Sequence, residues 1–388
     1  MRIVSVVGTR PQLIKAAALQ PALRARHDEV FVDTGQHWDD ALAGTFFREL
    51  GLARPDHSLA AGGGTHAEQT AAMLLGLEPI LQAAAADVVL VYGDTNSTLA
   101  GALCAAKLGL PVAHVEAGLR SFDRAMPEEL NRLVTDHLSA WCFAPTPTAV
   151  ANLEREGLGA RTWLVGDLMQ DIAARVAREV RAPDSLATVS AVPLGPAELP
   201  PLSPGGYLFA TIHRAENREP EAVRAWAALL RRVAHPDRPI ILPLHPGTLG
   251  PLEASGADLG PHVILVEPLG YRSALTLQLH AAAVLTDSGG VQREAAWLGT
   301  PCLVLRSSTE WLEAVRESEG GMLVVGLDAD AAAVALDRLA PLEAARSLAR
   351  TRAAALDLSA VGAAEAIANV LADDSPARAL ARLDARPD

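Results

Sequence analysis

The segment TDSGGVQRE, from Thr286 to Glu294, has the clearest chemical potential in this 388-residue chain. It joins an apolar run to a helical pattern through a turn that contains two glycines. The N-terminus of a helix presents unpaired N–H groups and the positive end of the helix dipole, and adjacent glycines let an anion approach the backbone closely. The turn therefore predicts a phosphate site, with an ordinary strand-to-helix turn capped by Ser288 as the alternative.

Carboxylates follow two other apolar runs. Asp94 comes after the run at 88–92, within the hydroxyl-rich sequence GDTNST, and Glu116 comes directly after the run at 112–115. The carboxyl ends of parallel strands meet at one edge of a sheet, and open α/β sheets bind their ligands there. We therefore expect the two carboxylates at the same ligand-binding edge.

Basic residues accompany these carboxylates. Arg10 and Lys15 follow the first apolar run, where Pro11 suits a helix start. Glu128 and Arg132 are four residues apart in a predicted helix, so they share one face of it. These positions suit a ligand that is anionic at one end and a sugar at the other.

Two histidines complete the pattern in the second half of the chain. His213 and His245 each lie at the end of an apolar run. Singly, such residues have structural explanations: Asp94 could cap its helix, Glu128 and Arg132 could form a surface ion pair, and either histidine could be a loop residue with satisfied hydrogen bonds. Those explanations do not predict that polar residues collect at one edge of both sheets, which favours a site for a sugar nucleotide.

The elements that must position these residues follow one pattern. Short runs rich in Val, Ile and Leu alternate with Ala- and Leu-rich segments of helical period, which is typical of parallel sheets covered by helices on both faces. The pattern predicts an α/β fold with two doubly wound, Rossmann-like domains. The predicted strands are residues 3–7, 29–32, 88–92, 112–115, 141–143, 207–212, 240–244, 263–266, 283–285 and 302–305.

A proline-rich stretch, residues 182–206, suits a surface connection because its six prolines cannot continue a helix. We place the domain junction just before the preceding helix, near Gly166. This gives an N-terminal domain of residues 1–166, a C-terminal domain of residues 167–360 and a helical segment of residues 361–388, whose packing against the first domain the sequence leaves open.

Composition excludes several classes of protein. The formal net charge of −13 argues against a nucleic-acid backbone as the partner. No apolar run is long enough to cross a bilayer, and the first residues read as a strand rather than a signal peptide. These features predict a cytoplasmic protein that binds neither nucleic acid nor membrane. Cys104, Cys142 and Cys302 have no metal-ligand spacing, so we expect three buried thiols rather than disulfides or zinc ligands. We also expect no metal site, because arginines and helix dipoles can do the work of a metal ion, and no cofactor.

Seven motifs along the chain resemble those of the non-hydrolysing UDP-N-acetylglucosamine 2-epimerases. They are GTRPxxIK from Gly8, TGQH from Thr34, GDT from Gly93, HVEAGLR from His114, PEExNR from Pro127, HRxEN from His213 and TDSGGxQxE from Thr286. The resemblance implies a homodimer of glycosyltransferase-B-like architecture with the active site in the interdomain cleft. It also implies reversible conversion of UDP-N-acetylglucosamine to UDP-N-acetylmannosamine, a precursor of cell-surface polysaccharide.

The implied reaction needs several carboxylates. The hydrogen on C2 of the sugar is not adjacent to a carbonyl carbon, so its direct removal would leave an unstabilised carbanion. The family's route eliminates UDP from C1 and the proton from C2 to give 2-acetamidoglucal, and then adds UDP back. Carboxylates stabilise the oxocarbenium character at C1, and the leaving diphosphate needs positive charge. By resemblance, Asp94, Glu116 and Glu128 are the acid/base and cation-stabilising candidates, and His213 is a fourth catalytic candidate.

The resemblance also implies how the nucleotide is bound. The glycine turn would hold the phosphates, Glu294 the ribose hydroxyls, and Arg10 and His213 would interact with the diphosphate. Tyr271 is a candidate for the uracil pocket, with a plain turn before a helix as the alternative. The substrate-binding candidates are Arg10, Lys15, Arg132, His245, Tyr271, Ser288, Gly289, Gly290 and Glu294.

The chain departs from the family's pattern in places that bear on regulation. Many bacterial members are activated by a second substrate molecule, which the Gln-His segment helps to bind. Here Gln36 and His37 are followed by Trp-Asp-Asp in place of a more polar continuation, so activation stays open. Gln69 and Arg120 complete the candidate allosteric set. The family also often has Glu where this chain has Gln12.

Three functions stay open on the sequence. The first is the 2-epimerase of UDP-N-acetylglucosamine. The second is the same scaffold acting on a related nucleotide sugar, such as a diacetamido uronic acid derivative, or a hydrolysing 2-epimerase that releases free N-acetylmannosamine. The third is a glycosyltransferase or a catalytically silent sensor. A transferase would usually show a basic or apolar patch for a membrane, and a silent binder would not need the three carboxylates.

Overall fold

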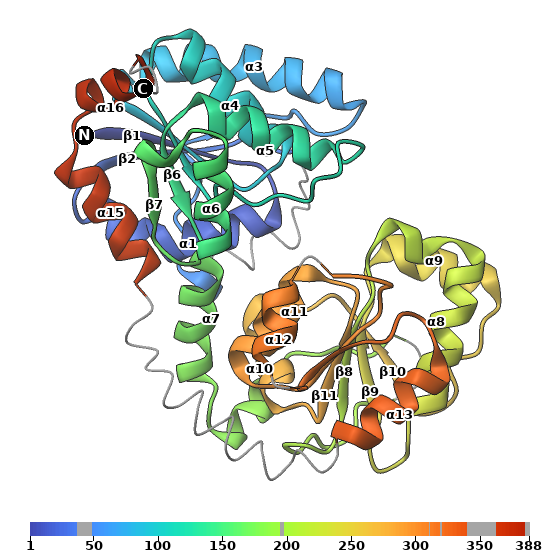
Figure 1. The fold of residues 1–388 in the computed structure, drawn as a ribbon. Helices are drawn as coiled ribbons and strands as arrows, with labels where there is room; N and C mark the ends of the chain where they lie inside the picture. The colour runs from blue at the N-terminus through green and yellow to red at the C-terminus, as the bar shows by residue number, and fades with distance from the viewer. Residues whose placement is uncertain (37–48, 195–197, 310, 319, 340–361, 385–388) are drawn as a thin grey trace. The chain divides into compact units, whose positions relative to one another are not determined.

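The computed structural model describes residues 1–36, 49–194, 198–309, 311–318, 320–339 and 362–384. The chain divides into two compact units, Met1–Ile172 with Val361–Asp388 (unit 1) and Ala173–Ala360 (unit 2). Each unit is a parallel sheet between layers of helices, as Figure 1 shows. The predicted α/β class with two Rossmann-like sheets is confirmed.

Unit 1 is built on a seven-stranded parallel sheet. Its strands, in spatial order, are β3 (His57–Ser58), β2 (Asp28–Asp33), β1 (Arg2–Val7), β4 (Val88–Tyr92), β5 (Val112–Val115), β6 (Ser139–Ala144) and β7 (Thr162–Leu164). Every residue of β4 and β5 is buried, because helices cover both faces of a doubly wound sheet. Because β4 and β5 pair in parallel, their carboxyl ends lie side by side, and the turns after them are neighbours.

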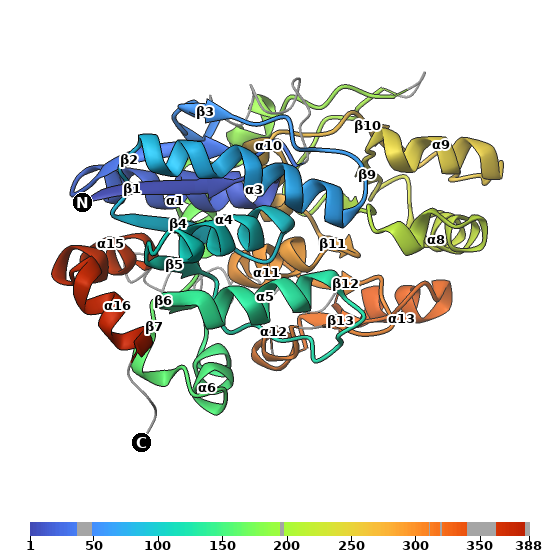
Figure 2. The same cartoon turned by 90° about the horizontal axis from the view of Figure 1, so that it is seen from above.

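The helices of unit 1 form the layers on this sheet. They are α1 (Arg10–Arg24), α3 (His66–Ala83), α4 (Asn96–Lys107), α5 (Pro127–Leu138), α6 (Pro147–Arg155), α15 (Ala363–Asp373) and α16 (Pro376–Asp384), with α7 (Leu168–Glu179) at the division between the units. Helices α3, α4 and α5 pack side by side (Figure 2). Met73 and Leu77 of α3 join Val89 and Val91 of β4 in one apolar core.

The C-terminal helices belong to unit 1. Helix α15 packs on α1, where Glu365 forms an ion pair of 2.8 Å with Arg26. Trp141 of β6 donates from Nε1 to Asp374 at 3.0 Å, between α15 and α16. The end of the chain is thus tied to the first sheet by polar contacts as well as by the buried face of α15.

Unit 2 repeats the architecture with six parallel strands. In spatial order they are β10 (Val263–Val266), β9 (Ile240–Pro243), β8 (Leu208–Thr211), β11 (Ala283–Thr286), β12 (Cys302–Val304) and β13 (Met322–Val324). Its helices are α8 (Pro220–Val233), α9 (Pro246–Ser255), α10 (Tyr271–His280), α11 (Gly289–Leu298), α12 (Leu312–Glu317) and α13 (Ala329–Leu339). One core lies between the sheet and α8, α9 and α13, and a second lies between the sheet and α10 and α11.

All ten predicted strands are present, with ends that differ by at most two residues from the predicted ones. Three further strands, β3, β7 and β13, were not predicted. Each is two or three residues long and lies at an edge of its sheet. Edge position does not explain the omission, because β10 is also an edge strand and was predicted, and β13 itself consists of apolar residues.

Two predictions from composition can be compared with the described residues. Cys104, Cys142 and Cys302 are free and buried, as expected. Within the ranges that the structure describes, no helix has the combination of length and hydropathy that crossing a membrane requires.

Candidate functional site

The ends of β4 and β5 bring two carboxylates together in unit 1. Asp94 is the second residue after β4, and Glu116 is the first after β5. A Cβ placed on Gly93 would lie 3.4 Å from Oε2 of Glu116 and 3.5 Å from Nζ of Lys15, so these two groups reach the turn that carries Asp94. The predicted collection of polar groups at one edge of this sheet is present, and we call Lys15, Asp94, Glu116 and Arg132 the carboxylate cluster.

Each carboxylate of the cluster is paired with a cation from a neighbouring helix. Lys15, from the second turn of α1, forms an ion pair with Glu116, and both side chains are largely buried. Arg132, from α5, forms an ion pair with Asp94. Alternating charges let four ionisable groups converge at one sheet edge without a large repulsion between the carboxylates.

The surroundings favour the protonated form of Asp94 more than water does. Burial raises the pKa of Asp94, and the negative charge of Glu116 adds to the rise, whereas Arg132 and Lys15 oppose it. A carboxyl group with a raised pKa next to a second carboxylate is a common arrangement for acid/base chemistry.

Glu116 is held in an unusual backbone conformation. Its φ angle is +70°, in the left-handed region that residues with a side chain seldom adopt. The N–H groups of Glu116 and Ala117 both donate to the carbonyl oxygen of Phe143, each at 3.1 Å. Gly118, with φ +82°, has no room for a side chain, because a Cβ there would lie 2.4 Å from the carbonyl oxygen of Ala149. The turn is thus fixed by its neighbours, and it aims Glu116 at Lys15.

Gln12 is a connecting residue that the sequence did not reveal as one. Its Oε1 accepts from the N–H groups of Gly8 and Thr9 at 2.8 and 3.1 Å, and its Nε2 donates to the carbonyl of Tyr92 at 2.6 Å and to Thr95. The amide therefore joins the start of α1 to the turn of Asp94. An ionised glutamate could accept the two N–H groups but could not donate to Tyr92, so the departure at this position changes the hydrogen bonds.

The other predicted residues of unit 1 lie at the same edge of the sheet. Arg10 is exposed at the first position of α1, and Glu128 is partly buried in the first turn of α5. Arg132 contacts Glu129 rather than Glu128 on its own helix, at 3.3 Å. Glu129 is buried and also accepts from the N–H and hydroxyl of Ser121. It therefore fixes both the loop before α5 and the guanidinium that reaches Asp94, a role that the (i, i+4) spacing did not predict.

In unit 2 a buried aspartate organises the ends of β8 and β11. Asp287 accepts from the N–H groups of His213 and Arg214, both at 3.0 Å, and from Nδ2 of Asn217 at 2.7 Å. Nδ1 of His213 also lies 3.0 Å from its carboxylate. Burial opposes ionisation, but the contacts with His213, Arg214 and Asn217 lower the pKa of Asp287 below its usual value. The contact assigns a proton to Nδ1 of His213 and leaves Nε2 for another partner.

The turn after β11 has the features of an anion site. Ser288 is the N-cap of α11, and its hydroxyl accepts from the N–H of Val291. The helix therefore starts at Gly289, and a Cβ placed on Gly290 would meet no atom closer than 3.9 Å, so the approach to this backbone is open. Glu294, one turn later, is buried and accepts from Nε2 of Gln278 at 2.8 Å. Ser288 thus caps the helix, as in an ordinary strand-to-helix turn. Because its hydroxyl accepts from Val291, the N–H groups of Gly289 and Gly290 stay available to an anion.

The remaining candidates of unit 2 lie at helix starts. His245 is the N-cap of α9, and its Nδ1 accepts from the N–H of Gly247 at 3.2 Å. Tyr271 is the first residue of α10 and is buried. His245 follows the end of β9, as the sequence indicated, and Tyr271 stands where the loop after β10 enters a helix.

The candidate allosteric residues of unit 1 have internal partners. Oε1 of Gln36 accepts from the N–H and hydroxyl of Ser97, and Oε1 of Gln69 accepts from Asn96. The side chain of Arg120 is 1% exposed and pairs with Asp136 and Glu156. His37 lies outside the described residues. Arg120 therefore supports the fold from within, and a ligand on the surface would not reach it without a rearrangement.

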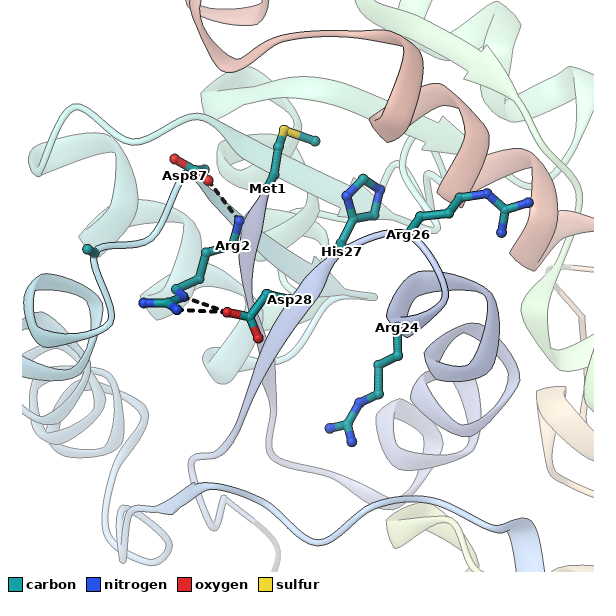
Figure 3. Close-up of a pocket in the computed structure, with 8 residues that line it drawn as sticks. Met1, Arg2, Arg24, Arg26, His27, Asp28 and Asp87 are labelled. Carbon is teal, nitrogen blue, oxygen red and sulfur yellow. Dashed lines mark hydrogen bonds and ion pairs between the residues drawn. The ribbon is translucent and has the colours of Figure 1, made fainter.

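A pocket lies at the opposite edge of the unit 1 sheet, at the amino ends of β1 and β2 (Figure 3). It is lined by Met1, Arg2, Arg24, Arg26, His27, Asp28, Ala85 and Asp87. The guanidinium of Arg2 pairs with Asp28 at 2.8 Å, and the backbone N–H of Arg2 donates to Asp87 at 2.7 Å. Arg24 and Arg26 pair with Glu29 and Glu365. Its arginines are thus matched by carboxylates, and the pocket is separate from the carboxylate cluster.

Each unit thus has a Rossmann-like sheet, with the carboxylate cluster at a strand-end edge of unit 1 and an open glycine turn at a helix start in unit 2. Residues 21–372 match the family model for UDP-N-acetylglucosamine 2-epimerase. The chain belongs to this family.

Two relatives with different substrates are similar to the chain. The UDP-2,3-diacetamido-2,3-dideoxy-D-glucuronate 2-epimerase of Pseudomonas aeruginosa is 42% identical over 336 residues, which cover 85% of this chain and 90% of that protein. The UDP-N-acetylglucosamine 2-epimerase of Methanocaldococcus jannaschii is 38% identical over 335 residues, which cover 84% and 88%. The crystal structure of a UDP-GlcNAc 2-epimerase from M. jannaschii in complex with UDP-GlcNAc and UDP matches with a TM-score of 0.78, at 34% identity over 96% of this chain and 100% of that one.

The central position of Asp287 predicts a large loss of stability when its carboxylate is removed. In Asp287→Ala the N–H groups of His213 and Arg214 and the buried amide of Asn217 lose their acceptor. We expect a loss of about 3–5 kcal/mol in the free energy of unfolding, measured by urea denaturation. Asp328→Ala is the matched control, since Asp328 is exposed and accepts from two N–H groups at the start of α13. It should cost about 1 kcal/mol. Equal losses in the two variants would contradict the role of Asp287.

Proposed function

We propose that this protein interconverts UDP-N-acetylglucosamine and UDP-N-acetylmannosamine by elimination and re-addition of UDP. The observation that carries the proposal is the carboxylate cluster, in which Asp94 and Glu116 lie together and each is paired with a cation. The reaction removes a proton from C2 on one face and returns it on the other, so it needs more than one acid/base group. Asp94 and Glu116 are assigned to these roles, with Glu128 as the third carboxylate for the oxocarbenium character at C1.

The nucleotide is assigned to the groups of unit 2. The N–H groups at Gly289 and Gly290, with the positive end of α11, suit the diphosphate. To donate from Nε2 to the same charge, His213 must carry a proton on both ring nitrogens, because Asp287 already accepts from Nδ1. Glu294 suits the ribose hydroxyls, since Gln278 holds its carboxylate in place. These assignments need no metal ion.

A second candidate substrate is a UDP-diacetamido uronic acid, because the relative from P. aeruginosa acts on that class and is 42% identical. The charges of the cluster favour a neutral sugar. Lys15 and Arg132 are already paired with Glu116 and Asp94, and Glu129 adds a further negative charge. A uronate carboxylate would bring one more negative charge into this group.

We also propose that the protein works in the cytoplasm and forms a homodimer. Three free, buried thiols suit a reducing compartment. The homodimer follows from the resemblance of the motifs to the epimerase family.

Proton NMR in heavy water tests the reaction. With UDP-N-acetylglucosamine we expect UDP-N-acetylmannosamine that carries deuterium at C2, because elimination and re-addition pass through a protonation step open to solvent. Free N-acetylmannosamine with UDP would identify a hydrolysing enzyme instead. Turnover of the diacetamido uronate alone, in the same assay, would favour the second candidate. No turnover of either sugar would refute the proposal.

Substitutions in the cluster test the assigned roles. Asp94→Asn and Glu116→Gln should each lower kcat about a hundredfold or more, because each removes an acid/base group while nearly keeping the shape of the side chain. UDP affinity, measured by calorimetry, should stay within about twofold. Asp28→Asn is the control, since Asp28 lies at the opposite edge of the same sheet. Parallel losses of UDP binding and turnover would argue against catalytic roles.

Glu294 offers a separate test of nucleotide binding. Glu294→Ala removes the carboxylate assigned to the ribose, so calorimetry should show UDP bound about tenfold or more weakly. Gln278→Ala keeps Glu294 but removes the amide that holds it, and it should weaken binding less. Unchanged affinity in Glu294→Ala would remove Glu294 from the ribose site.

A further inference from the structure

His114 is a fully buried histidine whose two ring nitrogens both face hydrogen-bond acceptors. It lies in β5, two residues before Glu116. Its Nδ1 is 2.6 Å from Oδ1 of Asp136, and its Nε2 is 2.7 Å from the carbonyl oxygen of Gly93. No step of the proposed reaction uses this side chain, so its burial between two acceptors calls for another explanation.

The hydrogen bonds of His114 determine how many protons this histidine and Asp136 hold together. A neutral imidazole has one N–H donor and one acceptor nitrogen, so it can donate to only one of two acceptors. The carbonyl of Gly93 can only accept, so Nε2 carries a proton. A second proton then lies between Nδ1 and Asp136. Asp136 also accepts from the N–H of Gly118 at 3.1 Å and from Arg120 at 2.7 Å, and these donors favour its ionised form. The second proton therefore belongs on Nδ1.

The partners of His114 lie in the two turns that carry the carboxylates. Gly93 directly precedes Asp94, and Gly118 is in the turn that Glu116 opens. Both glycines have positive φ angles, +64° and +82°, so each turn needs a backbone conformation that few residues adopt. The buried side chains of His114 and Asp136 thus hold the carbonyl oxygen of Gly93 in one turn and the N–H of Gly118 in the other.

We propose that His114 is a buried imidazolium that positions the carboxylate cluster. Nε2 fixes the carbonyl of Gly93 and thereby the start of the turn of Asp94. Nδ1 holds Asp136, which in turn holds the N–H of Gly118 behind Glu116. The effect on turnover rests on the function proposed for Asp94 and Glu116, whereas the protonation state does not.

The positive charge of His114 is balanced within the fold. Asp136 lies between His114 and Arg120, and Arg120 also pairs with Glu156 at 2.6 Å. Two cations and two carboxylates therefore alternate, and the network carries no net charge. Burial opposes ionisation of Asp136, but His114 and Arg120 lower its pKa below the usual value. The thiol of Cys142 donates to the main-chain carbonyl oxygen of Asp136, and burial raises the pKa of this thiol, which keeps it neutral.

Nitrogen NMR of protein labelled with ¹⁵N at its 11 histidines tests the protonation state. The spectrum is recorded at about pH 8, where an exposed histidine is neutral, and the His114 signals are those missing from His114→Gln. We expect both ring nitrogens of His114 at the shift of a protonated nitrogen. One protonated and one unprotonated nitrogen would overturn the proposal, whether or not the protein is active.

Two substitutions separate the two contacts of the ring. The amide nitrogen of His114→Gln can take the place of Nε2 and donate to Gly93, whereas that of His114→Asn can take the place of Nδ1 and reach only Asp136. If the contact with Gly93 positions Asp94, kcat should fall about a hundredfold in His114→Asn and about tenfold or less in His114→Gln, with KM within about threefold in both. UDP affinity and the urea midpoint establish that both variants fold.

The outcomes distinguish this inference from the proposed function. Equal kcat values in two folded variants would overturn the positioning role even when the wild-type protein is an active epimerase. If the wild-type protein turns over no nucleotide sugar, the proposed function fails, and positioning is then read from the carboxyl ¹³C signal of Asp94. Its titration should shift in His114→Asn and stay near the wild-type position in His114→Gln, and the absence of such a difference would overturn the proposal.

Discussion

A buried aspartate ties together the strand-end turns in each unit of this protein. Asp136 in unit 1 accepts from the N–H of Gly118 after β5, and Asp287 in unit 2 accepts from the N–H groups of His213 and Arg214 after β8. Each aspartate also contacts a histidine side chain. Removing a carboxylate from water costs several kcal/mol unless several donors replace the solvent. Because the donors come from the turns themselves, the same hydrogen bonds that offset this cost also fix the turns in place. Asp94 and Glu116, assigned to chemistry, and His213, assigned to the diphosphate, lie on turns that these contacts fix.

Much of the fold could be predicted from the sequence, because the central strands are buried on both faces. Such strands read as uninterrupted apolar runs, and all ten runs became strands. The short strands β3 and β7 include polar residues and show no such run, whereas β13 is apolar and was nevertheless not predicted. The sequence also indicated which edge of each sheet would carry polar groups, because the polar residues that follow parallel strands must meet at their carboxyl ends.

The partners of those polar groups could not be predicted, because they depend on distances between segments that are far apart in the chain. The spacing of Glu128 and Arg132 indicated one shared helix face, yet Arg132 reaches Glu129 and Asp94 instead. Gln12 and Asp136 are polar residues at helical positions, and nothing in their local sequence shows that each joins two turns. Asp287 stands beside the glycines of a recognisable motif, but its partners follow a different strand.

The hydrogen bonds of unit 1 make the carboxylate cluster a single preorganised body. Gln12 joins the first turn of α1, which leads to Lys15, to the turn of Asp94. The ion pair of Lys15 with Glu116 joins the same helix to the next turn. Any displacement of α1 would therefore move both carboxylates, and a displacement of one carboxylate alone would break a buried contact. Groups that must act on neighbouring carbons of one sugar benefit from such coupling, because a misplacement of about 1 Å can cost about a hundredfold in rate.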